Sequence, residues 1–266
     1  MIKFFNPCNY IRYLFRILFF YTNKNLFHGE TPKYFTDGTV TSHIFGGSTD
    51  IAFKKSIADS KKEFVHPLYH EWRLYIACII LKMLLQKRKI KYVECGVGEG
   101  HTLKVFMNYI KHSKQKKLKD NYNRSIYLLM DTFSGVDISL VPKKDRENKY
   151  ITKAYGDSTL SVIKKRFSSL KKRVNFIQGS IPSTLDRIPK KFNSPDFLHI
   201  DMNNPIPEVS AINFFIRSMK PGSILLLDDY SFASAKTQRQ YIDRYFDKIE
   251  KSRPLTLPSG QGIYFF

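Results

Sequence analysis

The stretch KYVECGVGEGHT, residues 91–102, decides the fold of this chain. Its first half is a short apolar run of the kind that forms a buried parallel strand, and its second half is a glycine-rich turn that runs into a helical pattern. Glycines in such a turn let a ligand approach the backbone closely, and the start of the next helix favours an anionic group. The stretch therefore predicts a strand, a nucleotide-type binding loop and a helix in direct succession.

The glycine-rich turn does not match the dinucleotide-binding fingerprint. That fingerprint places a third glycine at position 101, which is His101 here, and an acidic residue about 20 positions farther on. The acid that ends the next apolar run is Asp131, in MDTFSG (130–135), where a carboxylate can accept hydrogen bonds from both ribose hydroxyls. Together with Glu94 at the end of the first run, Asp131 indicates a nucleoside cofactor.

Apolar runs and helical stretches alternate along the rest of the chain. This alternation predicts an α/β fold, Rossmann-like and doubly wound, with a mostly parallel seven-stranded sheet and helices on both faces. A long helix that starts near His66 precedes the first strand, and a hairpin over 255–266 would add antiparallel pairing at the C-terminus. The expected strands are 91–95, 125–131, 173–179, 196–202 and 223–229, and the expected helices between them are 101–114, 158–170, 207–219 and 235–251.

The composition fits one large domain with an appendage. The 266 residues are 42% hydrophobic, which is enough for a full core, and we expect residues 61–266 to form the domain and residues 1–60 an N-terminal extension. The net charge of +21 would suit a polyanionic partner, but the lysines are scattered in short runs typical of solvated faces. Three widely spaced cysteines predict neither a disulfide framework nor a zinc site, and they favour a reducing cytosol.

The segment YIRYLFRILFFY, residues 10–21, is apolar but too short to span a bilayer, and it contains Arg12 and Arg16. It has two interpretations. One is a helix that lies on the anionic inner surface of the membrane, which would make a cytoplasmic protein a peripheral one. The other is a helix that packs on the domain itself or on a second copy in a homo-oligomer.

Three aspartates end two neighbouring strands of the predicted sheet. Asp201 ends the fourth expected strand, and Asp228 and Asp229 end the fifth. The carboxyl ends of adjacent parallel strands meet, and carboxylates gathered there repel one another unless a cation lies among them. Oxygen ligands select magnesium, calcium or manganese, so the pattern favours a divalent metal. The alternative is that individual aspartates cap the helices that follow.

Five motifs together resemble the macrocin O-methyltransferase family (TylF-like), over roughly residues 61–266: ECGVGEGHT, MDTFSG, QGSIPSTLD, HIDMN and PGSILLLDDY. The resemblance implies an S-adenosylmethionine (SAM) dependent enzyme that methylates hydroxyls of sugars attached to natural products. It also implies that Asp201, Asp228 and Asp229 hold magnesium and that Asp201 is the general base.

The same resemblance implies a cofactor site. The methionine half of SAM would lie on the glycine-rich loop, the ribose on the residues after the second strand, and the adenine on those after the third. The residues implied, in that order, are Glu94, Gly96, Gly98, Gly100 and Thr102, then Asp131 and Thr132, then Gly179 and Ser180. From the residues alone, Glu94 has a second interpretation as a carboxylate that caps the amides of the loop.

Two departures from the family pattern bear on the acceptor and the metal. Asn203 stands where members commonly have a second aspartate, and it can still offer a carbonyl oxygen to a metal, so the expected site survives with its strength left open. Residues 98–101 read Gly-Glu-Gly-His where the macrolide enzymes tend to have Trp-Arg-Gly-Gly, which predicts an acceptor other than a macrolide sugar.

Two other functions compete with methylation of a sugar hydroxyl. The charge suggests an RNA methyltransferase, although the chain lacks the Asn/Asp-Pro-Pro-Tyr motif of amino-group methylation; the fold also suits a non-catalytic Rossmann-like binding module in polysaccharide biosynthesis. The polar segment 137–155 is either a lid over the acceptor or a surface loop. We assign no catalytic role to the histidines at 66, 70, 101 and 199, because a lone histidine in a helix or strand is usually structural.

Overall fold

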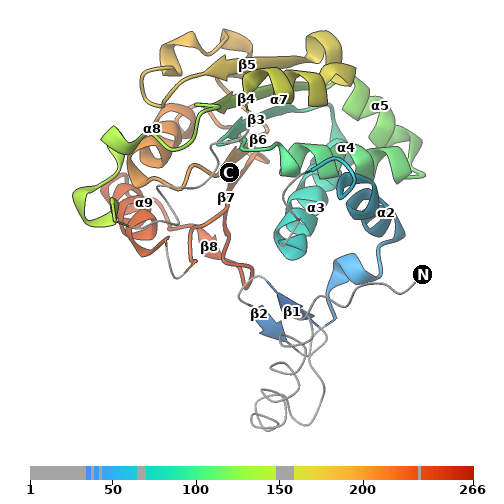
Figure 1. The fold of residues 1–266 in the computed structure, drawn as a ribbon, viewed down its shortest axis with the longest axis horizontal. Coiled ribbons are helices and arrows are strands. Elements are labelled where there is room, and N and C mark those ends of the chain that lie inside the picture. The colour runs from blue at the N-terminus through green and yellow to red at the C-terminus, as the bar shows by residue number, and fades with distance from the viewer. Residues whose placement is uncertain (1–33, 37–38, 42–43, 65–69, 148–158, 233–234) are drawn as a thin grey trace, which may run out of the picture.

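The computed structural model describes residues 34–36, 39–41, 44–64, 70–147, 159–232 and 235–266 (Figure 1). Its helices are α2 (Ile51–Ser60), α3 (Glu71–Lys87), α4 (His101–His112), α5 (Lys116–Arg124), α7 (Leu160–Arg166), α8 (Pro205–Ile216) and α9 (Lys236–Lys248). Its strands are β1 (Tyr34–Thr36), β2 (Thr39–Thr41), β3 (Lys91–Cys95), β4 (Ile126–Asp131), β5 (Val174–Gln178), β6 (Phe197–Ile200), β7 (Ile224–Leu227), β8 (Leu255–Thr256) and β9 (Gly262–Phe265).

Seven strands form the central sheet, in the order β5-β4-β3-β6-β7-β9-β8. The first five of these strands are parallel, and β9 runs antiparallel to both β7 and β8, which confirms the predicted seven-stranded sheet with a C-terminal hairpin. The chain leaves β3 toward β4 on one side and later returns to β6 on the other. Open α/β sheets bind their ligands at the carboxyl ends of the strands that flank such a reversal, which are β3 and β6 here.

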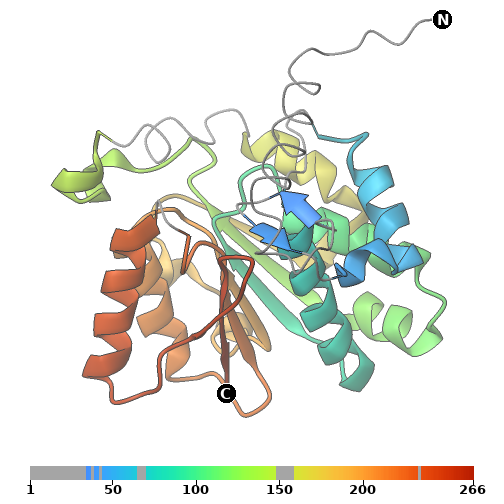
Figure 2. The same ribbon diagram turned by 90° about the horizontal axis from the view of Figure 1, so that it is seen from below.

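Helices cover both faces of the sheet, as predicted. Figure 2 shows α8 and α9 on one face and α2, α3, α4, α5 and α7 on the other. The five parallel strands contribute to two hydrophobic cores, because alternate side chains point to opposite faces: Tyr92 and Leu129 belong to one core, and Val93 and Leu128 belong to the other. Burial on both faces is the reason that the strands are continuous apolar runs in the sequence.

Helix α2 lies within the predicted N-terminal extension but packs into the main core. Asp50 caps its first turn by accepting a hydrogen bond from the Phe53 amide at 3.0 Å, and Phe53 and Ile57 are buried beside α4. The segment 10–21 lies outside the described residues. None of the helices in the described part of the chain combines the length and apolarity that a bilayer crossing requires.

Helix α5 has no counterpart among the expected elements. Its sequence, KKLKDNYNR, is almost entirely polar, but Leu118 is buried, and the Asn121 side-chain amide donates to the Leu85 carbonyl at 2.7 Å. These two contacts attach the short helix to the rest of the domain. A single buried leucine does not produce the apolar periodicity by which a helix is recognised in a sequence.

Candidate active site

The glycine-rich loop brings β3 into contact with the end of β6. Gly96 has a φ of 87°, and a Cβ added there would lie 1.8 Å from the Asp201 carbonyl oxygen. Gly100 has a φ of 80°, and a Cβ there would lie 2.7 Å from the Phe167 ring. Glycine is therefore required at both positions, and the loop passes against the residue predicted to be the general base.

Asp131 is the carboxylate that holds this loop. Its Oδ2 accepts hydrogen bonds from the amides of Val97 at 2.6 Å and Gly98 at 2.9 Å, and its Oδ1 accepts from the Phe133 amide at 2.7 Å. The capping role that the sequence allowed for Glu94 thus belongs to Asp131. Glu94 is buried, and its Oε2 has no hydrogen-bond partner among the described residues.

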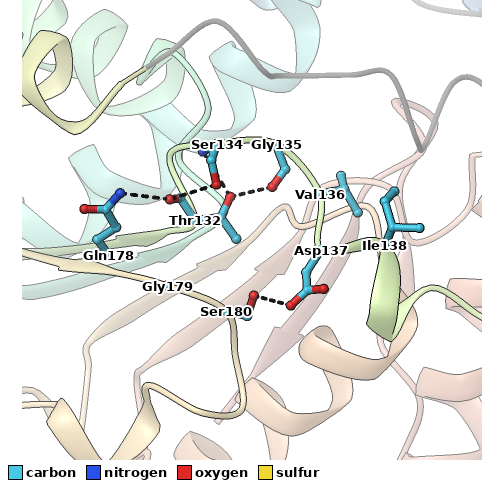
Figure 3. Close-up of a pocket in the computed structure, with 9 residues that line it drawn as sticks. All are labelled: Thr132, Ser134, Gly135, Val136, Asp137, Ile138, Gln178, Gly179 and Ser180. Carbon is cyan, nitrogen blue, oxygen red and sulfur yellow. Dashed lines mark hydrogen bonds between the residues drawn. The ribbon is translucent and has the colours of Figure 1, made fainter.

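A pocket of about 470 Å³ opens beside the loop, between the segment after β4 and the end of β5 (Figure 3). Ser180 donates to Asp137 Oδ2 at 2.5 Å, and this bond, together with those from Ser139, holds the pKa of Asp137 below its usual range. The structure thus brings three of the predicted cofactor residues, Thr132, Gly179 and Ser180, into one cavity. The lining residues are Thr132, Ser134, Gly135, Val136, Asp137, Ile138, Gln178, Gly179 and Ser180.

Part of the segment predicted to be a lid borders this pocket. Residues 148–155 lie outside the described residues, but the preceding residues form two short turns of 3₁₀ helix, Ile138–Leu140 and Lys143–Asp145. Thr237 of α9 donates to Asp145 Oδ1 at 3.1 Å, so this part of the segment is attached to α9.

The strands β6 and β7 end side by side, as predicted. Ile200 pairs with Leu227, and the Asp228 amide donates to the Ile200 carbonyl at 2.9 Å, so Asp201 and Asp228 are the next residues of adjacent strands. Burial and the charges of Asp228 and Asp229 raise the pKa of Asp201 well above its usual range. No described residue donates a hydrogen bond to the Asp201 carboxylate, which is half-buried.

Two buried cations that the sequence analysis did not assign to the site meet these carboxylates. Arg73 of α3 is 5% exposed, and its Nη1 lies 2.8 Å from Asp228 Oδ2 and 2.7 Å from Asp229 Oδ1. His199 of β6 is 1% exposed and lies between Glu94 Oε1 at 3.3 Å and Asp228 Oδ1 at 3.6 Å.

Both cations change the protonation of the cluster. Burial by itself disfavours a charged imidazole, but Asp228 and Glu94 outweigh it and raise the pKa of His199 to about 10. Burial would likewise raise the pKa of Asp228, yet Arg73 and His199 hold it well below its usual range. Asp228 and His199 therefore carry opposite charges at neutral pH.

This arrangement does not fit the predicted magnesium site. Both oxygens of Asp228 are already engaged, Oδ2 by Arg73 and Oδ1 by the Gln261 amide at 2.7 Å, and Arg73 also holds Asp229. Among the described residues, no three His, Cys, Asp or Glu side chains form a group that could hold a metal ion. Asn203 is buried and has a φ of 53°.

The sequence carried a faint signal for these missed residues. Arg73 is the single cation in the first three turns of a helix that is otherwise rich in apolar side chains, and His199 interrupts a fully buried strand. A charged group that must be buried needs an opposite charge beside it.

Comparisons with known proteins agree with this geometry. A family described as "Methyltransferase domain" matches residues 93–230, from the first strand of the sheet to the end of the acidic cluster. NovP, an O-methyltransferase, superposes with a TM-score of 0.63 at 14% identity over 82% of this chain and 98% of that chain. CalS11, the calicheamicin methyltransferase, superposes with a TM-score of 0.58 at 13% identity over 84% and 94%.

At 14% and 13% identity, these superpositions show that NovP and CalS11 share the fold of this chain. A comparison with curated proteins finds no match. The family match spans more than half of the chain and includes the glycine-rich loop, Asp131 and all three clustered aspartates, so the chain belongs to the methyltransferase domain family.

Proposed function

We propose that this methyltransferase transfers the methyl group of SAM to a hydroxyl of a sugar or of a glycosylated small molecule. The observation that carries the proposal is Asp201 at the carboxyl end of β6: its carboxylate receives no hydrogen bond from the described residues, and its backbone carbonyl lies against Gly96 of the glycine-rich loop. A base in that place can reach an acceptor beside the cofactor. The motifs shared with the macrocin O-methyltransferase family and the likeness to NovP, an O-methyltransferase, support a hydroxyl acceptor.

The described residues fit SAM as the cofactor. Glu94 leaves a buried carboxylate oxygen without a partner next to the loop, which suits the ammonium group of the methionine half. Gly96, Gly98, Gly100 and Thr102 would provide a close backbone surface for that half. Asp131 and Thr132 would receive the ribose, and the pocket at Gly179 and Ser180 would receive the adenine.

SAM supplies an electrophilic methyl group when bound. Asp201 accepts the proton of the acceptor hydroxyl while the hydroxyl oxygen forms a bond to the methyl carbon and the carbon–sulfur bond breaks. S-adenosylhomocysteine (SAH) and the methyl ether are the products, and the proton remains on Asp201 until it passes to water. Burial and the charges of Asp228 and Asp229 raise the pKa of Asp201, which makes its carboxylate a stronger base than an exposed one.

The magnesium ion that the resemblance assigns to Asp201, Asp228 and Asp229 has no part in this mechanism. The contacts of Arg73 and Gln261 engage both carboxylate oxygens of Asp228 and one of Asp229.

The proposal is tested by calorimetry and a methyl-transfer assay. The full-length protein should bind SAH with a stoichiometry of one, and radiolabelled SAM should label a member of a panel of nucleotide sugars and glycosides. Total RNA, assayed in parallel, should stay unlabelled. Failure to bind SAH, or labelling of RNA alone, would refute the proposal.

A further inference from the structure

Arg73 connects three parts of the chain around the acidic cluster. It begins on α3, its Nη1 contacts Asp228 and Asp229 after β7, and its Nε donates to the Ser259 carbonyl at 3.2 Å in the turn before β9. Its guanidinium also lies over the Phe232 ring, 4.9 Å from the centroid. These contacts come from several directions, so they hold the Arg73 side chain in a single conformation.

We propose that Arg73 is the built-in cation of this carboxylate cluster, in place of a divalent metal, and that methyl transfer is metal-independent. The inference rests on the proposed function for its catalytic part. Arg73 acts as a positioning residue: it fixes Asp228 and Asp229 and leaves the neighbouring Asp201 as the carboxylate available to an acceptor.

A magnesium ion at this cluster would compete with Arg73 for the same carboxylate oxygens. A magnesium ion binds carboxylate oxygens at about 2.0–2.1 Å and needs near-octahedral geometry. Asp228 Oδ2 and Asp229 Oδ1 are the oxygens nearest Arg73, at 2.8 and 2.7 Å, so an ion on the same two atoms would lie directly against the guanidinium. Two desolvated cations cannot share that space without strong repulsion.

A guanidinium can make this set of contacts, whereas an ammonium group cannot. A guanidinium presents planar donors to several acceptors at once, and it stacks on aromatic rings. Arg73 uses both properties, because it spans two carboxylates and a carbonyl and lies over Phe232. A lysine has a single compact ammonium and would not reproduce this set of contacts.

Metal titration of the EDTA-treated, full-length protein tests the inference without any acceptor. Wild-type protein should show no Mn²⁺ site tighter than about 1 mM by electron paramagnetic resonance. Arg73→Met removes the cation but keeps much of the apolar stem, and it should bind Mn²⁺ at least about tenfold more tightly than wild type. The matched control is Arg88→Met, which removes a surface ion pair with Asp196 (Nη2–Oδ1 2.8 Å) and should bind no better than wild type.

A methyl-transfer assay distinguishes positioning from a merely structural role. In EDTA, wild type should keep its full rate, R73M should lose kcat with an SAH Kd within about threefold of wild type, and added Mn²⁺ should restore part of that loss. R73K should not recover the wild-type rate. These readings require an identified acceptor, whereas the Mn²⁺ titration does not, so a failure of the proposed function leaves the metal test valid.

A wild-type chain that binds one Mn²⁺ at micromolar concentration and loses activity in EDTA would overturn the inference. A folded R73M variant with no gain in Mn²⁺ affinity would do the same. If R73M does not fold, the wild-type titration still decides between the guanidinium and the metal.

Discussion

At the scale of single residues, two aspartates at the ends of sheet strands have opposite surroundings. Asp131 accepts three backbone amide bonds and fixes the glycine-rich loop. Asp201 accepts none from the described residues, and burial with neighbouring negative charge raises its pKa. The first carboxylate therefore belongs to the scaffold of the proposed cofactor site, and the second is the one that could accept a proton from an acceptor.

Asp201→Asn should abolish proton acceptance while keeping the shape of the side chain. We expect kcat to fall by about 10²–10⁴-fold, the range for loss of a general base, with the SAH Kd within about threefold of wild type. Steady-state kinetics and calorimetry measure the two quantities. Asp247→Asn, which changes an exposed carboxylate paired with Arg253, is the matched control. Near wild-type turnover in D201N would exclude Asp201 as the base.

Asp131→Ala should loosen the glycine-rich loop, because the amides of Val97 and Gly98 lose their acceptor. We expect the SAH Kd to rise by about 10–100-fold, which corresponds to roughly 1.4–2.8 kcal/mol. Calorimetry against the surface variant Asp120→Ala checks this. An unchanged SAH affinity would mean that the loop keeps its shape without Asp131.

At the scale of secondary-structure elements, a buried carboxyl joins α8 to α9. Glu208 of α8 accepts a hydrogen bond from the Gln238 side chain of α9 at 2.9 Å and another from the Met202 amide at 3.3 Å. Burial raises the pKa of Glu208 to about 8, because it outweighs these bonds and because Asp229 adds to it. The folded state therefore favours the protonated form of Glu208 more than the unfolded chain does.

The stability of this helix pair should depend on pH. The folded pKa of about 8 lies above the ordinary value of 4.5, so the contribution of Glu208 is complete below pH 4.5 and is lost as the pH rises through 8. Glu208→Gln keeps an acceptor oxygen and removes the titration. We expect E208Q to match wild type near pH 5 and to exceed its Tm near pH 9, whereas the exposed control Glu250→Gln follows wild type. Equal slopes of Tm against pH in E208Q and wild type would contradict this.

At the scale of the whole molecule, β3 lies between β4 and β6, and this strand order brings the proposed site residues to one edge of the sheet. The glycine-rich loop, Asp131 and the aspartates of β6 and β7 all follow carboxyl ends of parallel strands, so one edge of the sheet brings them together. The net charge of +21 belongs to the surface as a whole and was the main reason to consider RNA as the acceptor.

The salt dependence of binding should distinguish RNA binding by surface charge from SAH binding in the proposed cofactor site. RNA binding carried by scattered lysines and arginines should weaken by about 10³–10⁵-fold between 50 and 200 mM salt if it involves 6–10 phosphate contacts. We expect the SAH Kd to change by less than about threefold over the same range, because the proposed cofactor contacts are local and partly buried. Calorimetry for SAH and filter binding for RNA measure both. RNA binding that falls this steeply with salt, together with methyl transfer to RNA at low salt, would favour the RNA enzyme.

Local sequence patterns determined much of this molecule. The five parallel strands, the glycine-rich loop and the helices at 101–112 and 205–216 follow from apolar runs, glycines and caps that lie within a few residues of one another. The meeting of Asp201 with Asp228 also followed from the sequence, because parallel strands end at a common edge.

Only the tertiary structure decided which cations meet those carboxylates. Arg73 and Asp228 are 155 residues apart, and no local periodicity or spacing relates a helix before the sheet to the end of its fifth strand. Gln261 reaches Asp228 from the C-terminal turn for the same reason: packing of α3 and β9 against β7 sets these contacts. Sequence therefore predicted where negative charge gathers, and the fold determined that a guanidinium, together with an imidazole, neutralises it.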